Sequence, residues 1–346
     1  MKKLLYFTVG RSTFVLKDIE ILKSEYEVII FDFKIKSKVL VPFEFIRQVL
    51  FILFKGSKAK ILLTQFGGYH SFIPVLFSKF SKKKSVIVLG GNDTVSFPSI
   101  QYGSFNNSLM RPFLKYSLRK ANLLLPVSET LIEVDYTYQE NDFPKQGYTN
   151  FVPGIKTPVK IIYNGFDPDR WFIGDKEPNS FVTVAADLRT RFGPVLKGMD
   201  LILGIAALFP DCKFYIVGGE FLNEKAPENV MKLPLVSSQE LRQILSTKQF
   251  YLQLSMSEGF PNGLCEGMIS GCVPICSNVG AMPLIMKDFG YVLQKKSLNQ
   301  LKGLITKAKE EYSSDKSVLT RKRILTEFSL NRRKAEFLEA LSEIQD

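Results

Sequence analysis

Two glutamates in the segment 257–271, SEGFPNGLCEGMISG, have the type and spacing to do chemistry. Glu258 and Glu266 lie eight positions apart, with the turn-forming sequence Gly-Phe-Pro-Asn between them. Pro261 fits the turn before a helix and Asn262 is a good helix cap, so free backbone N–H groups would form an anion site here. A carboxylate can accept two hydroxyl hydrogen bonds at once, which suits a ribose or another sugar. The alternative for Glu266 is that it only favours the helix dipole.

A second pair of residues, Arg191 and Lys197, occurs in the segment RFGPVLKGMD. They lie six positions apart across a Gly-Pro turn, so both could reach one point. A guanidinium and an ammonium that converge suit a diphosphate, and they would make its charge tolerable beside the two glutamates. The alternative is two solvated loop cations.

These residues need a scaffold, and apolar strands alternate with helical patterns along the chain. Strands are expected at 2–10, 26–33, 59–66, 84–91 and 121–128, with helices at 71–80 and 108–120. After a polar linker that starts with a strand, 158–180, strands are expected at 181–188, 212–219, 249–257 and 272–278, with helices at 199–208, 238–245, 262–270 and through 298–344. Such alternation predicts parallel sheets covered on both faces, with ligands at the carboxyl ends of the strands.

The predicted fold class is therefore α/β, with two Rossmann-like domains that face each other across a cleft. We predict an N-terminal domain over 1–165, a C-terminal domain over 166–325, and a helix over 326–346 that packs back towards the N-terminal domain. A chain of 346 residues, 45% apolar, is comfortable for two folded domains.

Composition also excludes some classes of protein. The apolar start of the chain stops at Gly10 without a cleavage site, and the apolar segment 39–54 is interrupted by Pro42, Glu44 and Arg47, so neither a signal peptide nor a membrane helix is expected. The four cysteines lack metal-ligand spacing, which indicates reduced thiols in a cytoplasmic protein and no metal site.

With these motifs in this order, the chain resembles retaining nucleotide-sugar glycosyltransferases of the GT-B fold, specifically glycosyltransferase family 4. SEGFPNGLCEGMISGCVP looks like the family's E-x7-E signature, and RFGPVLKGMD looks like its phosphate loop. IIYNGFDPDRW, FYIVGG and LLLPVSETL resemble further family segments, and the match covers about residues 120–295.

The resemblance implies a role for each matching position. Arg191 and Lys197 would bind the donor diphosphate and stabilise its leaving charge, Glu266 would hold the ribose, and Glu258 would contact the transferred sugar. Other donor contacts would come from backbone positions, namely Gly218, Gly219, Phe260, Asn262 and Gly263. Family members retain the donor configuration, by front-face attack, without a divalent metal or a cofactor beyond the nucleotide-diphosphate sugar.

The acceptor side departs from the family. Gly91 stands where the family often has a histidine, Leu284 replaces a glutamate after Pro283, and the first-strand loop has only Gly10 followed by Arg11. Arg11 could contact a phosphate or an acidic acceptor, or could be solvated. The candidate acceptor residues are Gly10, Arg11, His70, Asn92 and Asp93, and His70 could equally be a satisfied loop histidine.

The net charge of +12 is concentrated in the first 160 residues, which carry about +11. Arg111, Lys115 and Arg119 form a basic stripe beside Phe113, Leu114 and Leu118 on an expected helix. This surface predicts reversible binding to anionic lipid on the inner face of the cytoplasmic membrane, with a soluble basic face as the alternative.

The predicted function is transfer of a sugar from a nucleotide-diphosphate sugar to a saccharide or lipid-linked saccharide, in the synthesis of a cell-surface polysaccharide. Two alternatives remain: a GT-B nucleotide-sugar epimerase, and a non-catalytic nucleotide-sugar-binding subunit of a glycosyltransferase complex. Nucleic-acid binding is disfavoured, because the cations come without aromatic stacking platforms in a recognisable module.

Overall fold

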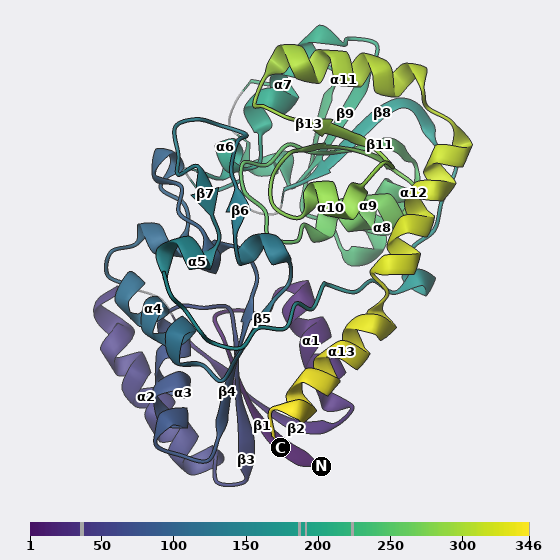
Figure 1. The fold of residues 1–346 in the computed structure, drawn as a ribbon. Helices are drawn as coiled ribbons and strands as arrows, with labels where there is room; N and C mark the ends of the chain where they lie inside the picture. The colour runs from purple at the N-terminus through teal and green to yellow at the C-terminus, as the bar shows by residue number, and fades with distance from the viewer. Residues whose placement is uncertain (35–37, 186–187, 191, 223–224, 346) are drawn as a thin grey trace.

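A computed structural model of the chain describes residues 1–34, 38–185, 188–190, 192–222 and 225–345. Figure 1 shows two α/β domains, one above the other, each built on its own parallel sheet. This confirms the predicted fold class.

The N-terminal sheet has five parallel strands in the order β2-β1-β3-β4-β5. Their bounds are β1 (Lys2–Thr8), β2 (Tyr26–Asp32), β3 (Ala59–Gln65), β4 (Lys84–Leu89) and β5 (Leu123–Pro126). All five predicted strands are confirmed. In the register, Leu4 of the interior strand β1 lies opposite Val28 of β2 on one side and Ile61 of β3 on the other. The sheet is buried on both faces, which explains why its strands read as continuous apolar runs.

Helices cover both faces of this sheet, with α2, α3 and α4 on one side and α1 on the other (Figure 1). Their bounds are α1 (Thr13–Lys23), α2 (Val41–Lys55), α3 (Tyr69–Lys79), α4 (Arg111–Lys120) and the short α5 (Tyr148–Phe151), with a small antiparallel pair β6 (Val134–Asp135) and β7 (Lys145–Gln146). The two predicted helices begin within three residues of α3 and α4. Neither α1 nor α2 was predicted.

The C-terminal sheet has six parallel strands in the order β10-β9-β8-β11-β12-β13. Its strands are β8 (Glu177–Val184), β9 (Lys213–Val217), β10 (Val230–Leu233), β11 (Lys248–Gln253), β12 (Val273–Ser277) and β13 (Tyr291–Leu293). Its helices are α6 (Gly193–Leu196), α7 (Met199–Leu208), α8 (Ser238–Ser246), α9 (Asn262–Ile269), α10 (Met282–Met286), α11 (Leu298–Glu310) and α12 (Ser314–Glu327). The four predicted strands are confirmed, and the two short edge strands, β10 and β13, are additional.

The linker differs from its prediction at both ends. The strand expected at its start is reduced to one isolated bridge between Val159 and Leu124. Its last residues, from Glu177, already belong to β8. Glu177 starts this strand because its carboxylate has partners on the neighbouring strands, so a polar residue is stable there.

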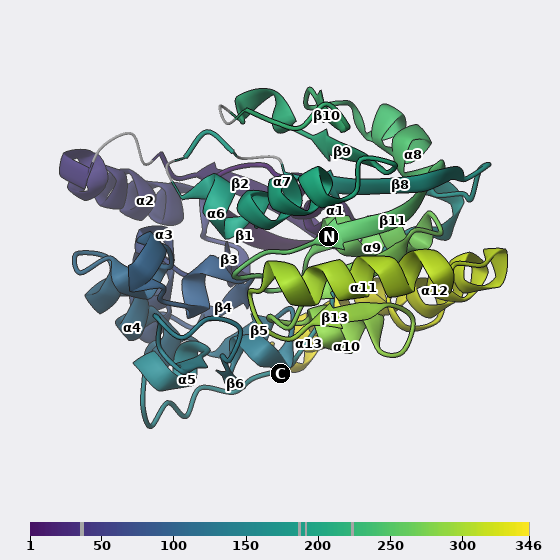
Figure 2. The same ribbon diagram turned by 90° about the horizontal axis from the view of Figure 1, so that it is seen from above.

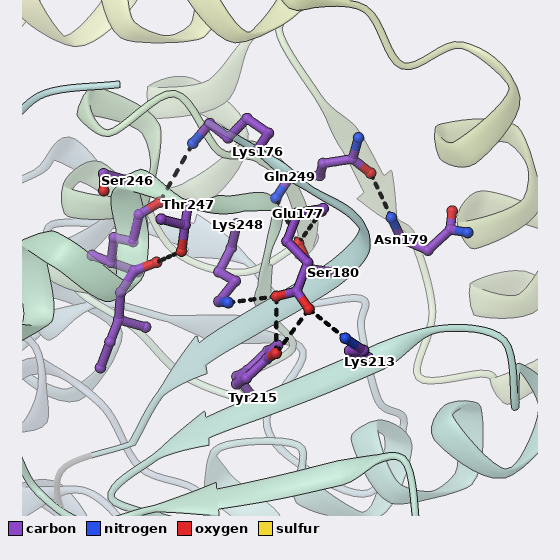
Figure 3. A network of polar contacts seen from close by, with 12 residues as sticks. Lys176, Glu177, Asn179, Ser180, Lys213, Tyr215, Ser246, Thr247, Lys248 and Gln249 are labelled. Atoms are coloured by element: carbon purple, nitrogen blue, oxygen red, sulfur yellow. Dashed lines mark hydrogen bonds and ion pairs between the residues drawn. The ribbon is translucent and has the colours of Figure 1, made fainter. Parts of the chain in front are cut away.

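A polar cluster around Glu177 fixes the amino end of the C-terminal sheet (Figure 3). Its carboxylate accepts hydrogen bonds from Lys213 Nζ at 2.7 Å, Lys248 Nζ at 2.6 Å and the Tyr215 hydroxyl at 2.8 Å. Burial opposes ionisation, but these donors outweigh it and lower the Glu177 pKa to about 2. The cluster ties β8, β9 and β11 together at the end opposite to the one where the candidate site lies.

The C-terminal helix α13 (Leu330–Glu343) crosses back to the N-terminal domain and lies beside α1 (Figure 1). Arg333 forms a bidentate ion pair with Asp18 of α1, with both N–O distances at 2.8 Å. It also donates to the carbonyls of Ile162 and Tyr163. The last helix therefore ties the chain's end, the linker and the first domain into one unit.

Candidate active site

Glu258 and Lys197 lie together at the carboxyl end of the C-terminal sheet. Lys197 Nζ is 2.6 Å from Glu258 Oε1. The same oxygen accepts hydrogen bonds from Ser255 Oγ at 2.8 Å and Gln253 Nε2 at 3.0 Å. Both charged side chains are partly buried, with 27% of Lys197 and 14% of Glu258 exposed. Three donors on one oxygen fix the Glu258 carboxylate in a single orientation.

The loop that carries Lys197 is held against the loop after β11 by backbone contacts. Met256 donates its N–H to the Leu196 carbonyl at 2.8 Å. Gly198 has a φ of 67°, and a Cβ there would lie 2.2 Å from the Leu254 carbonyl oxygen. A glycine is therefore required directly after Lys197, and it lets the lysine reach Glu258.

Arg191, the predicted partner of Lys197, lies outside the described residues. Its role at the diphosphate stays a prediction. Its neighbour Phe192 is described, and its ring lies 5.7 Å from that of Tyr102 in the N-terminal domain.

Glu266 lies on α9 and is partly buried. Burial raises its pKa to about 7, and the charge of Lys17 on α1 opposes that shift. A cation of the first domain thus acts electrostatically on a carboxylate of the second. The expectation that Asn262 caps this helix was wrong: Pro261 is the N-cap residue, and the Asn262 Oδ1 accepts a hydrogen bond from Asn164 Nδ2 at 3.0 Å instead.

The remaining donor-side positions lie at the same edge of the sheet. Gly218 and Gly219 follow β9 directly. Gly263, in the first turn of α9, faces Tyr251 so closely that a Cβ would lie 2.4 Å from the tyrosine hydroxyl. Phe260 is buried, and its ring packs against Tyr163 of the linker and Phe328. The side chain of Phe260 is therefore an apolar anchor, which leaves its backbone for any donor contact.

Loops of the two domains meet at Glu258. A Cβ on Gly259 would lie 2.1 Å from the Gly90 carbonyl oxygen, so the glycines at 90–91 and 259 allow the two loops to touch. Gly91 has a φ of 145°, and a side chain there would also approach Gly259. The position that holds a histidine in the resembled family thus holds a residue without a side chain, and the two domains are in contact across it.

Three of the five acceptor candidates line one cavity of about 400 Å³ at the carboxyl ends of the N-terminal strands. These are His70, Asn92 and Asp93. Asp93 is buried and accepts hydrogen bonds from the N–H groups of Gly67, Gly90 and Gly91, so it holds the cavity's loops. The Asp93 pKa is raised above its ordinary value, because the effect of burial outweighs the opposing effect of these N–H groups.

His70 is a buried, hydrogen-bonded histidine. Its Nε2 is 2.8 Å from the Gln65 carbonyl oxygen, which makes Nε2 the protonated nitrogen. Burial lowers the His70 pKa to about 4, although this hydrogen bond opposes the shift. His70 is therefore neutral near pH 7 and shapes the cavity rather than bringing charge to it.

The other two acceptor candidates, Gly10 and Arg11, do not line this cavity. Arg11 Nη2 pairs with Asp32 at 2.6 Å on the exposed surface. Its charge is therefore shared with a carboxylate of β2. Arg11 is therefore not a purely solvated side chain, and its contact with a phosphate or an acidic acceptor stays a prediction.

In the predicted lipid-binding stripe on α4, the cations lie at the surface, but the apolar residues do not. Leu114 and Leu118 are fully buried, and Phe113 packs against the rings of other core residues. Arg111 donates to the Phe105 carbonyl, and Arg119 to that of Pro153. The interpretation of α4 as an amphipathic surface with Phe113, Leu114 and Leu118 on its lipid side was wrong, because these side chains form the contact of α4 with its own domain.

Sequence reasoning missed several residues at the site. Gln253 and Ser255 are polar positions at the end of an otherwise apolar strand, FYLQLS, and that position was a usable signal. Lys17 and Asn164 reach the site from the first domain and the linker, and their neighbours in the sequence give no sign of it. Among the described residues, no group of three or more His, Cys, Asp or Glu side chains is placed to hold a metal ion. Within the same residues, every helix is too short or too polar to cross a bilayer.

Glu266 gives a prediction that separates stability from binding. The folded-state pKa of about 7 exceeds the ordinary value of 4.5, so the folded protein holds an extra proton between these values and loses stability as the pH rises through them. Glu266→Gln removes this buried charge, so we expect a higher Tm than the wild type at about pH 8 and a difference that shrinks towards about pH 5.

The same substitution should weaken nucleotide-sugar binding by roughly 10-fold or more, because a neutral amide is a poorer acceptor for ribose hydroxyls than a carboxylate. Thermal unfolding and calorimetric titration measure the two effects. Glu310→Gln, on the exposed side of α11, is the matched control and should change neither. A Tm difference that does not vary with pH would contradict the role assigned to burial.

Comparison with known proteins finds a family similarity in the second half of the chain. Residues 176–323 match the family "Glycosyl transferases group 1". A human subunit of phosphatidylinositol N-acetylglucosaminyltransferase is 25% identical over 215 residues, which are 57% of this chain and 42% of that protein. A Campylobacter jejuni protein, N-acetylgalactosamine-N,N'-diacetylbacillosaminyl-diphospho-undecaprenol 4-alpha-N-acetylgalactosaminyltransferase, is 26% identical over 261 residues, 70% of this chain and 65% of that protein. The chain thus matches less than two thirds of the length of each relative.

Solved structures resemble the chain over nearly its whole length. A sucrose-phosphate synthase from Thermosynechococcus elongatus has a TM-score of 0.76 at 11% identity, over 99% of both chains. The Anabaena protein HepE in complex with UDP-glucose has a TM-score of 0.71 at 12% identity, also over 99% of both chains. At this level of identity these likenesses show the fold, which is that of GT-B glycosyltransferases.

Proposed function

We infer that this chain, a GT-B protein whose residues 176–323 match the glycosyl transferases group 1 family, is a glycosyltransferase that takes a sugar from a nucleotide-diphosphate sugar. The observation that carries the inference is the fixed pair of Lys197 and Glu258 at the edge where the two domains meet. The pair offers a cation for a diphosphate and an oriented carboxylate for a sugar in one place.

The reaction is a displacement at the anomeric carbon of the donor. Lys197, with Arg191, binds the diphosphate and stabilises the charge that it gains as its bond to the sugar breaks. Glu258 orients the sugar through its hydroxyls. The acceptor hydroxyl attacks from the same face, its proton passes to the leaving phosphate oxygen, and the new bond keeps the donor configuration. The route needs no divalent metal and no protein nucleophile, in keeping with the resemblance to family 4.

The acceptor lies on the N-terminal side, in the cavity lined by His70, Asn92 and Asp93. Its polar groups, neutral His70 among them, suit an uncharged saccharide. Both relatives are named for acceptors that contain a lipid, phosphatidylinositol and diphospho-undecaprenol. We therefore propose a lipid-linked saccharide as the acceptor, in the synthesis of a cell-surface polysaccharide. The enzyme would be cytoplasmic and would bind reversibly to the membrane.

A thermal-shift screen across nucleotide sugars tests this proposal, because a ligand of the native state raises its Tm. One nucleotide sugar should raise the Tm of the wild type, and Lys197→Ala should reduce that shift. A screen in which no nucleotide sugar binds would contradict the proposal. Binding without turnover of any acceptor would favour the alternative of a non-catalytic partner in a glycosyltransferase complex.

A further inference from the structure

The helix α2 has an exposed apolar face that the domain's own fold does not use. Along one side of the helix, five large side chains are exposed: Phe43, Ile46, Leu50, Leu53 and Phe54, with exposed fractions of 66%, 59%, 47%, 57% and 78%. On the other side, Val41 and Ile52 are buried in the domain core. A helix that is apolar on all sides is normally covered on all sides, and a contiguous apolar patch marks an interaction surface.

Lysines without acidic partners border this face. Lys55 is the last residue of α2 and Lys58 follows it, while Lys79 and Lys82 lie at the end of α3, on either side of Phe80, which is 85% exposed. Lys83, which follows α3, connects the end of α3 to the end of α2, because its Nζ donates hydrogen bonds to the carbonyls of Gly56 at 2.6 Å and Ala59 at 2.7 Å. Within the described part of the chain, none of the four bordering lysines forms an ion pair, and all four are exposed.

Acidic side chains close to the face are already neutralised. Glu44, the acid in the first turn of α2, pairs with Arg47. Asp32, at the end of β2, pairs with Arg11. The surface therefore combines exposed aromatic and aliphatic side chains with an uncompensated cationic border, and its occupant must be apolar and anionic at once.

We propose that this α2 face, with Phe80 and the four lysines, docks the protein on an anionic lipid bilayer. The aromatic and aliphatic side chains enter the boundary between headgroups and acyl chains, and the lysines contact anionic headgroups. The inference rests on the proposed function, because a lipid-linked acceptor would be presented at such a surface. It moves the lipid contact from α4, whose apolar side is buried, to α2.

The position of α2 suits this role. Figure 2 shows α2 at the outer edge of the N-terminal domain, away from the C-terminal domain, so docking leaves the second domain free to move. Gln48 of α2 donates to the His70 carbonyl at 2.7 Å. The docking helix α2 is thus in direct contact with the start of α3, which lines the proposed acceptor cavity. A lipid-linked acceptor in the bilayer would therefore be close to this cavity.

Flotation of the full chain with vesicles tests the proposal. We expect binding to vesicles of phosphatidylcholine with roughly 30% phosphatidylglycerol and much weaker binding to phosphatidylcholine alone. The triple variant Phe43→Gln/Leu50→Gln/Phe54→Gln should bind the anionic vesicles at least ~10-fold more weakly. The matched control Phe172→Gln/Val318→Gln/Leu319→Gln changes three exposed apolar residues outside the N-terminal domain, and it should bind like the wild type.

Removal of the cationic border is a separate arm of the same experiment. Lys55→Gln, Lys58→Gln, Lys79→Gln and Lys82→Gln together should reduce binding to the anionic vesicles to the level seen with phosphatidylcholine alone, a loss of roughly 100-fold or more. Equal binding of the wild type and the apolar triple variant would overturn the proposal. Equal binding of the wild type to vesicles with and without phosphatidylglycerol would also overturn it.

A fluorescence reporter shows whether α2 itself enters the bilayer. The chain has one tryptophan, Trp171, and it is buried. Phe54→Trp should therefore give a blue shift on addition of anionic vesicles, whereas Phe172→Trp should not. No shift at position 54 would overturn the proposal.

Two further outcomes are distinguishable from these. Light scattering could show that the wild type is a dimer and that the apolar triple variant is a monomer. This result would assign the α2 face to contact with a second copy of the chain, and it would overturn the lipid proposal. A thermal shift with nucleotide sugars, measured on the same samples, reports on the proposed function alone. Vesicle binding without nucleotide-sugar binding would reject the proposed function, and the reverse would reject the α2 surface.

Discussion

Lys197→Ala is expected to lower kcat/KM for sugar transfer by roughly 100- to 1,000-fold. The ammonium lies where the diphosphate gains charge as it leaves, and removal of one such preorganised group costs about that much in other enzymes. The loss should fall on kcat more than on KM, because the charge develops in the transition state. Steady-state kinetics with the nucleotide sugar found by thermal shift measures it. Lys302→Ala, an exposed lysine on α11, is the matched control and should change kcat/KM less than about 2-fold.

The contact of 2.6 Å between Lys197 and Glu258 adds a second expectation. Glu258→Gln should also be strongly impaired, but the double variant should lose much less than the product of the two single losses. Groups that act as one unit are not additive, since either change disables the same site. Fully multiplicative losses would contradict a shared site, and near-normal rates for Lys197→Ala would contradict the mechanism.

Arg333→Met is expected to destabilise the protein by about 3–5 kcal/mol. Only 5% of the Arg333 side chain and 1% of that of Asp18 are exposed, so the substitution leaves a buried carboxylate without its partner. It also removes the donors to the Ile162 and Tyr163 carbonyls, which hold the linker. The urea midpoint of the transition that reports on the N-terminal domain measures the effect.

The adjacent residue gives a control for this loss. Arg332→Met removes an exposed ion pair with Glu336 and should cost less than about 1 kcal/mol. Replacement of both buried partners, Asp18→Leu with Arg333→Met, should recover part of the stability, because no buried charge remains. Equal midpoints for Arg332→Met and Arg333→Met would contradict the role of the buried pair.

The strands were predictable because buried parallel strands are continuous apolar runs. The helix α2 was not predictable in the same way. Its segment, VPFEFIRQVLFILFK, is apolar on both faces, so no helical period stands out. Glu177 was placed in the linker because a charged residue reads as exposed, whereas its lysine and tyrosine partners come from strands far along the chain.

The site was predictable where its residues lie in one local motif. Lys197 and Glu258 belong to two segments at neighbouring strand ends, and parallel topology brings such ends together. The contacts between domains were not predictable, because they depend on how the two sheets are oriented. The electrostatic effect of Lys17 on Glu266, the hydrogen bond from Asn164 to Asn262, and the approach of Gly91 to Gly259 arise only when the two domains meet. The burial of the apolar side of α4 was also not predictable, because it depends on packing against other elements and not on the sequence of this helix alone.

The most direct test is the configuration of the product, followed by proton NMR during the reaction of the full chain with a nucleotide sugar and a lipid-linked saccharide. A glycoside with the same anomeric configuration as the donor should form with the wild type, and none should be detected with Lys197→Ala/Glu258→Gln. An inverted product, or a product that forms equally well with the double variant, would contradict retaining sugar transfer at this site.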